Sequence, residues 1–85
     1  MDAIANFRAE LENILVPHKW SPTRQQLDAI AERVASEQPR GIASVGTIVC
    51  SVCPGTQLLA MEGTDNSDLR MLLSLALQAV AQARS

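Results

Sequence analysis

Aromatic residues are nearly absent from this sequence: there is no tyrosine, and Phe7 and Trp20 make up the whole aromatic fraction of 2%. Hydrophobic residues still account for 47% of the 85 residues, so the core must be aliphatic and rich in alanine. A chain of this length is expected to form a single domain whose one core leaves a small margin of stability. Disulfides, a metal or a second copy of the chain are the usual supports for such a domain.

The sequence also lacks an excess of positive charge. Seven basic and nine acidic residues give a net charge of −2 and a pI near 5.2. Proteins that bind nucleic acids gain affinity by displacing counterions from phosphates with lysine and arginine, so nucleic acid is not an expected partner. The acidic residues are scattered, which also argues against a protein that mimics a nucleic acid.

Long hydrophobic runs are missing as well. The segment Met1–Phe7 has neither the basic head nor the apolar stretch of a secretion signal, and no run approaches the roughly 20 apolar residues that cross a bilayer. The sequence therefore predicts a soluble cytoplasmic protein with no membrane contact.

Patterns that carry catalysis are absent too. The single histidine, His18, cannot by itself establish a catalytic triad. The glycines match neither a dinucleotide-binding nor a Walker pattern; they are Gly41, Gly46, Gly55 and Gly63. We therefore expect no enzyme activity and no cofactor.

Two amphipathic helices are predicted in the first half of the chain. Over about residues 2–15, large apolar residues recur at helical spacing, and Val16–Pro17 ends the run. A second helix is expected over about 22–38, with Ser21 as its N-cap and Pro22 in the first turn. Because a short link joins them, the two helices are expected to form an antiparallel helical hairpin.

The second half of the chain predicts a β-hairpin and a long helix. Residues 42–53 are mostly β-branched or small and indicate a strand, Pro54–Gly55 favours a turn, and residues 56–62 can return as a second strand. A helix follows over about 67–83. The predicted fold is therefore a single α+β domain of order α-α-β-β-α, with the β-hairpin packed against the long C-terminal helix.

Both cysteines lie in this predicted hairpin, at the CxxC spacing found in zinc sites and redox dithiols. In an extended strand Cys50 and Cys53 would point to opposite faces with Cα atoms about 10 Å apart, too far for a disulfide. A structural zinc site needs four ligands, and the chain offers the two cysteines and His18, so a carboxylate or a second chain would have to complete the site. Ordinary strand cysteines are the favoured interpretation; the alternatives are a metal site completed across a subunit interface and redox chemistry.

The predicted C-terminal helix has an unusually wide apolar arc of roughly 200° on a helical wheel. Leu77 falls within its main core-facing row, and Met71, Leu75 and Ala79 form a ridge beside it. We expect this ridge to be the interface of a homo-oligomer, a dimer in the first instance. The alternatives are that the first two helices cover the arc from within, or that a different protein does.

The link between the first two helices holds His18 and Trp20, which are candidates for ligand contact, although such a tryptophan more often plugs the end of a helical hairpin. The function expected from the sequence is that of a small regulatory or inhibitory accessory protein, which acts by protein–protein binding as a homo-oligomer. The alternative is a small-ligand or metal-binding protein whose site at a subunit interface uses His18, Trp20, Cys50 and Cys53.

Overall fold

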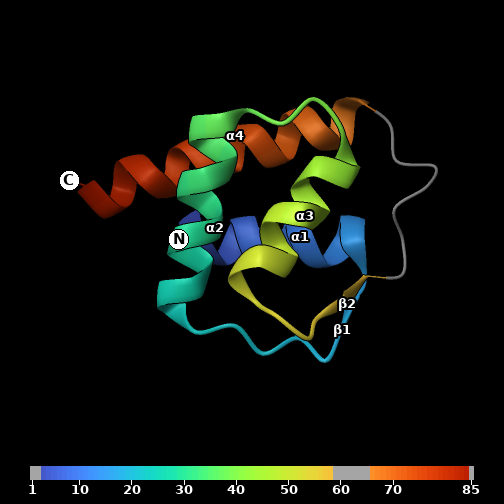
Figure 1. Cartoon of the computed structure of the whole chain (residues 1–85). Helices are drawn as coiled ribbons and strands as arrows, with labels where there is room; N and C mark the ends of the chain where they lie inside the picture. Colours follow the sequence, from blue (N-terminus) through green and yellow to red (C-terminus); the bar gives the residue numbers. More distant parts are fainter. Residues whose placement is uncertain (1–2, 59–65, 85) are drawn as a thin grey trace.

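Four helices and one short antiparallel strand pair form the fold. The computed structural model describes residues 3–58 and 66–84, and Figure 1 shows α1 and α4 side by side with α2 crossing them near both chain ends. The elements in chain order are α1 (Ala3–Leu15), β1 (Pro17–His18), α2 (Arg24–Glu37), α3 (Ile42–Val52), β2 (Gln57–Leu58) and α4 (Asn66–Arg84). All four helices contribute to one hydrophobic core.

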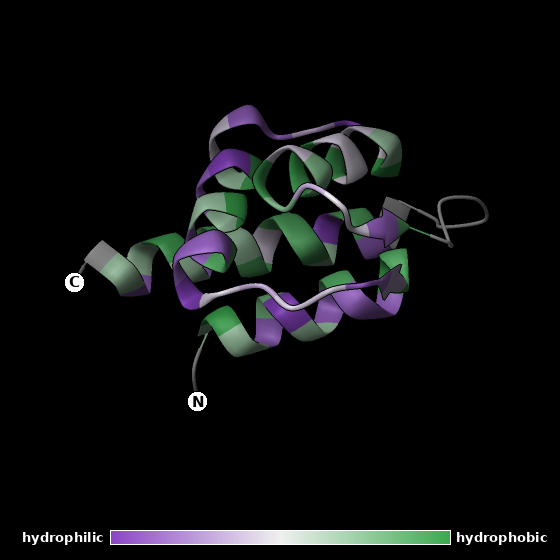
Figure 2. Ribbon diagram, turned by 60° about the horizontal axis from the view of Figure 1, so that its bottom comes forward, coloured by the Kyte–Doolittle hydropathy of each residue, from purple (hydrophilic) through white to green (hydrophobic). Residues whose placement is uncertain are grey.

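Helix α1 follows the apolar spacing read from the sequence. Its buried side chains are Ala3, Ile4, Phe7, Leu11, Ile14 and Leu15. The hydropathy colouring of Figure 2 alternates along this helix, as expected for one buried and one exposed face. The helix ends where Val16 takes a positive φ of 45° ahead of Pro17, because the residue before a proline is pushed out of helical geometry.

Helix α2 begins two residues later than expected, at Arg24, and Ser21 is not its N-cap. The cap is Thr23, whose hydroxyl oxygen accepts the Gln26 backbone N–H at 3.1 Å, while the Gln26 side chain accepts the Thr23 N–H at 2.9 Å. This reciprocal capping box satisfies two backbone donors, whereas a cap at Ser21 would place Arg24, which cannot accept a hydrogen bond, at the N3 position; the prediction for Ser21 was therefore wrong. At the other end Gln38 is left-handed, with φ of 46°.

The strand predicted over residues 42–53 is instead the helix α3. Composition suggested a strand, since β-branched residues favour extended structure. The spacing of the segment is nevertheless helical: the buried residues include Ile42, Val45 and Val49, at i, i+3 and i+7. The exposed Ser44, Thr47 and Ser51 repeat the same interval on another face. Burial of one helical face against α2 outweighs the weak preference of these residues for strands.

The expected β-hairpin is therefore absent from the described residues. Gln57 and Leu58 form β2, which pairs antiparallel with β1 so that Pro17 lies opposite Leu58. The predicted turn at Pro54–Gly55 is present, with Gly55 at φ of 94°, but it joins α3 to β2. The remaining residues of the predicted strand, 59–62, lie outside the described residues. A strand pair this short ties the segment after α1 to the segment after α3.

Helix α4 is the element on which the fold is assembled, because both α1 and α2 pack along it. Its buried side chains include Leu69, Leu72, Ala76 and Ala79. The Ala3 backbone N–H donates to Gln82 Oε1 at 2.9 Å, so the start of α1 lies beside the end of α4. Figures 1 and 2 both show the two chain ends on the same side of the molecule.

The α+β class predicted from the sequence holds in its coarse form, as a small helical domain with one antiparallel strand pair. The predicted element order does not hold, because a helix replaces the first strand of the hairpin. Within the described ranges, every helix is too short or too polar to cross a lipid bilayer.

Candidate functional site

The exposed face of α4 carries two large hydrophobic side chains. Met71 is 53% exposed and Leu77 is 51% exposed, and the other large hydrophobic residue with comparable exposure among the described residues is Val16. At about 100° per residue, Met71 and Leu77 point about 120° apart on the helix. They therefore belong to two different margins of α4, one on each side of its polar stripe.

The predicted oligomer ridge lies on the margin that contains Met71. The structure leaves Met71 exposed, packs Leu75 partly buried against the core, and buries Ala79 to 4% exposure. The ridge is therefore not continuous at the surface. Because α1 and α2 cover α4 on its two sides, most of the wide apolar arc is buried within the chain, which is the alternative left open by the sequence.

The other margin of α4 borders a groove against α2. One hollow of about 200 Å³ is lined by Asp28, Ala31, Glu32, Ala79, Val80 and Ala83. A second hollow of about 280 Å³ is lined by Glu32, Ala35, Ser36, Leu77 and Val80. Since Glu32 and Val80 line both, the two hollows adjoin each other between α2 and α4, and together they are called the groove. Its floor is apolar and its α2 rim is acidic.

This groove was not predicted from the sequence, because Leu77 was expected to lie among the core-facing residues of the last helix. A signal was present: Leu77 follows Arg70 by seven residues, so the two share nearly the same direction on the helix. Its half-exposed side chain follows from that direction, because Arg70 is exposed on the same face.

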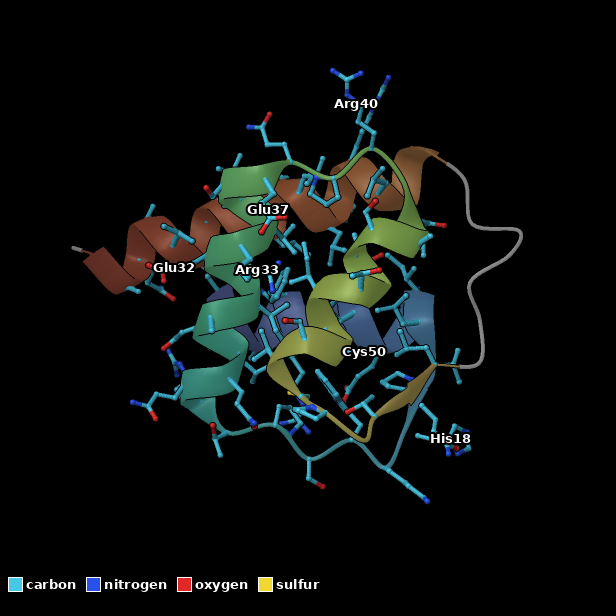
Figure 3. All side chains as sticks on the ribbon, in the orientation of Figure 1. His18, Glu32, Arg33, Glu37, Arg40 and Cys50 are labelled. Atoms are coloured by element: carbon cyan, nitrogen blue, oxygen red, sulfur yellow. The ribbon has the colours of Figure 1, made fainter. Side chains whose placement is uncertain are left out.

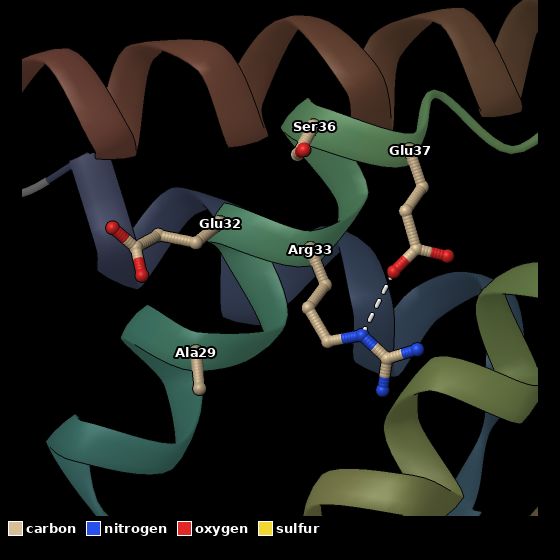
Figure 4. A pocket seen from close by; sticks show the side chains of 5 residues that line it. All are labelled: Ala29, Glu32, Arg33, Ser36 and Glu37. Carbon is tan, nitrogen blue, oxygen red and sulfur yellow. Dashed lines mark hydrogen bonds and ion pairs between the residues drawn. The ribbon is translucent and has the colours of Figure 1, made fainter.

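The outer surface of α2 beyond the groove is an ordinary solvated face. A hollow of about 380 Å³ is lined by Ala29, Glu32, Arg33, Ser36 and Glu37, all from this one helix. In Figure 4 the Arg33 guanidinium reaches Glu37 Oε2 at 2.9 Å, while Glu32 points away from this pair. An exposed ion pair between residues four apart contributes little stability. Since all five lining residues come from α2, this hollow is not a site at which two elements converge.

The predicted ligand contacts His18 and Trp20 have different surroundings. His18 is exposed at the β1 edge of the strand pair, where Figure 3 shows it. The Trp20 ring packs against the hydrophobic core, and its indole N–H donates to Glu12 Oε2 at 2.9 Å. Trp20 thus closes the end of the core between α1 and α2, the arrangement that is more common for a tryptophan in such a link.

Cys50 lies in the last turn of α3 and Cys53 is the C-cap of that helix, so neither is a strand residue, and both are free thiols. Cys53 is buried and Cys50 is exposed, with its Sγ 3.8 Å from the Thr56 carbonyl oxygen. Burial raises the pKa of the Cys53 thiol, and the neighbouring Cys50 raises it further. Both effects work against a reactive thiolate at Cys53.

A separate hollow lies between α3 and β2. It has a volume of about 340 Å³ and is lined by Ala43, Gly46, Thr47, Cys50 and Leu58. Small side chains on successive turns of α3 leave this space, and Leu58 closes one side. The lining is largely apolar and offers one thiol and one hydroxyl as polar groups, although Thr47 donates its hydroxyl to the Ala43 carbonyl at 3.1 Å.

The described residues contain neither a cluster of three or more histidine, cysteine or acidic side chains that could hold a metal, nor a buried polar side chain. Scans against protein-family models, curated proteins and solved structures give no match to this chain. The exposed hydrophobic side chains of α4 and its groove with α2 are thus the features that point most directly to a binding surface.

Proposed function

We propose that this protein is a small accessory protein of regulatory or inhibitory type, which acts by protein–protein binding as a homo-oligomer through α4. The observation that carries this proposal is the half-exposed Leu77 above an apolar groove. Single exposed hydrophobic side chains are common on protein surfaces, but a contiguous apolar patch with a polar rim is typical of an interaction surface. Leu77, the partly buried Leu73 and Val80, and the groove floor form such a patch.

A second chain would also support a domain with a small core. Burial of apolar surface on association adds to stability at about 25 cal/mol per Å², before the entropy of association is subtracted. Binding to the folded form alone shifts the unfolding equilibrium toward that form, so a homo-oligomer should melt at a temperature that rises with protein concentration.

Sedimentation velocity of the purified protein tests the proposal directly. The expected result is a species heavier than the 9.1 kDa chain, whose fraction grows with concentration across the micromolar range. A monomer at every concentration, with a melting temperature that does not change, would exclude the homo-oligomer.

The α3–β2 hollow supports the second candidate function, the binding of a small ligand. Its volume of about 340 Å³ lies at the lower end of the range for ligand pockets, about 300–1,000 Å³. An apolar ligand seated there would contact Cys50. It should therefore slow the alkylation of Cys50 by a maleimide, while a Leu58→Asp variant should lose that protection. Zinc analysis of the purified protein tests the metal-binding form of this candidate.

A further inference from the structure

We propose that the homo-oligomer is an antiparallel, two-fold dimer in which the α4 margin of one chain packs into the α2–α4 groove of the other. This inference rests on the proposed homo-oligomer and names its interface and register. The interface row consists of Arg70, Leu73, Leu77 and Val80. At about 100° per residue these four side chains lie within about 80° of one another, so they form one strip along α4.

The strip is polar at one end and apolar along the rest. Arg70 is exposed near the N-terminal end of α4 and makes no ion pair with the residues that the structure describes. Leu73 and Val80 are partly buried against the core, and Leu77 is half exposed between them. Acidic groups flank the opposite end, where Asp28 and Glu32 line the groove; Asp28 also accepts from Arg24 Nε at 3.4 Å in an exposed ion pair, which is weak enough to leave the carboxylate open to a second cation.

This charge distribution is self-complementary only when the two helices run in opposite directions. A two-fold interface brings the same patch of both chains together, so each contact occurs twice. A two-fold axis midway between Leu73 and Val80 places each of these residues opposite the other in the partner. The same axis sets Arg70 opposite Ala83, which lines the groove together with Asp28 and Glu32. A parallel arrangement would instead bring like charges together.

The groove accommodates the apolar part of the strip. Leu77 and Val80 line the hollow of about 280 Å³ together with Ala35 and the acidic rim residue Glu32. A leucine of the partner can enter this hollow because alanine and serine on α2 leave space beside α4. The two chains would then interdigitate side chains as helices do in ordinary packing. The Arg70 guanidinium of one chain would lie beside the acidic rim of the other chain, at the edge of the contact. Attraction between these opposite charges favours the antiparallel register.

The other margin of α4 provides a matched control. Met71 and Leu77 are exposed to nearly the same extent, on the same helix, and differ in the direction they face. Leu77→Glu buries an unpaired charge in the proposed interface and should weaken dimerisation at least tenfold. Met71→Glu should leave the dimerisation constant within a factor of about two. Both side chains are half exposed within one chain, so both variants should keep the helical circular dichroism of the wild type.

Charge reversal tests the register. Arg70→Glu should weaken the dimer, because the new carboxylate would face two acidic residues of the partner. Adding Glu32→Arg to this variant should restore much of the lost association. Sedimentation equilibrium of these variants and of the wild type gives the constants. Greater weakening by Met71→Glu than by Leu77→Glu would overturn this interface while leaving the proposed oligomer in place. Failure of Glu32→Arg to rescue Arg70→Glu would overturn the antiparallel register. A monomeric wild type would overturn both proposals.

Discussion

The start of α2 gives the sharpest test of how this sequence fixes its helices. Thr23→Ala removes the hydroxyl that accepts the Gln26 N–H at 3.1 Å and leaves the Gln26 side chain as the remaining half of the capping box. The loss of a threonine cap costs about 1 kcal/mol, within a range of 0.5–2. For a domain of 60–100 residues, a change of 1 kcal/mol moves the melting temperature by about 4–8 °C. We therefore expect Thr23→Ala to melt about 4–8 °C below the wild type.

The control for this experiment is Ser21→Ala. Ser21 is exposed and is not the residue that caps α2, so its replacement should change the free energy of unfolding by less than about 0.5 kcal/mol. Thermal melts followed by circular dichroism, at one fixed protein concentration, compare the two variants. If Ser21→Ala lowered the melting temperature more than Thr23→Ala, the helix would begin at Pro22 and the capping argument would be refuted.

Three further changes test the core and α3. Replacing the exposed Ser44 and Ser51 together with alanine should raise stability by up to about 1 kcal/mol, since alanine is the better helix former; destabilisation in a urea titration would indicate a strand. The folded state holds the Cys53 proton more tightly than the unfolded state, because its pKa is raised. The associated stability is complete below the ordinary thiol value of about 8.5 and is lost as the pH rises through the folded-state pKa. Cys53→Ala should therefore make the alkaline decline in melting temperature shallower; an unchanged slope would refute this assignment. Trp20→Phe removes the hydrogen bond to Glu12 and should lower the free energy of unfolding by about 1 kcal/mol in a denaturant titration. Identical unfolding midpoints for the variant and the wild type would show that ring packing alone holds Trp20 in place.

Hydrophobic spacing accounts for the helices at both ends of the chain. Phe7 and Leu11 in α1, like Leu69 and Leu72 in α4, stand at helical intervals and are buried on one face. The segment 42–53 shows why composition is a weaker guide. Its β-branched residues suggested a strand, whereas its buried positions repeat at helical intervals and continue for longer than a typical strand. Periodicity and length together would have predicted α3 correctly.

The candidate site was less accessible to sequence reasoning. The width of the apolar arc on α4 drew attention to this helix, but the arc alone does not tell which part neighbouring elements cover. Ala79 is buried because α2 packs beside it. Leu77 stays half exposed because the α2 residues that face it are alanine and serine, whose side chains are too small to cover it. Such details depend on the crossing of two helices far apart in the sequence, which no local pattern specifies.

The position of α4 also governs the order of events when the chain is made. Helix α1 packs more extensively against α4 than against α2, and the residues of α4 come last in the described chain. Contacts between such distant segments form slowly, because a long loop must close first. At about 5–20 residues per second of synthesis, several seconds separate the completion of α1 from the appearance of α4. During that interval the apolar face of α1 is open to a chaperone or to a neighbouring nascent chain.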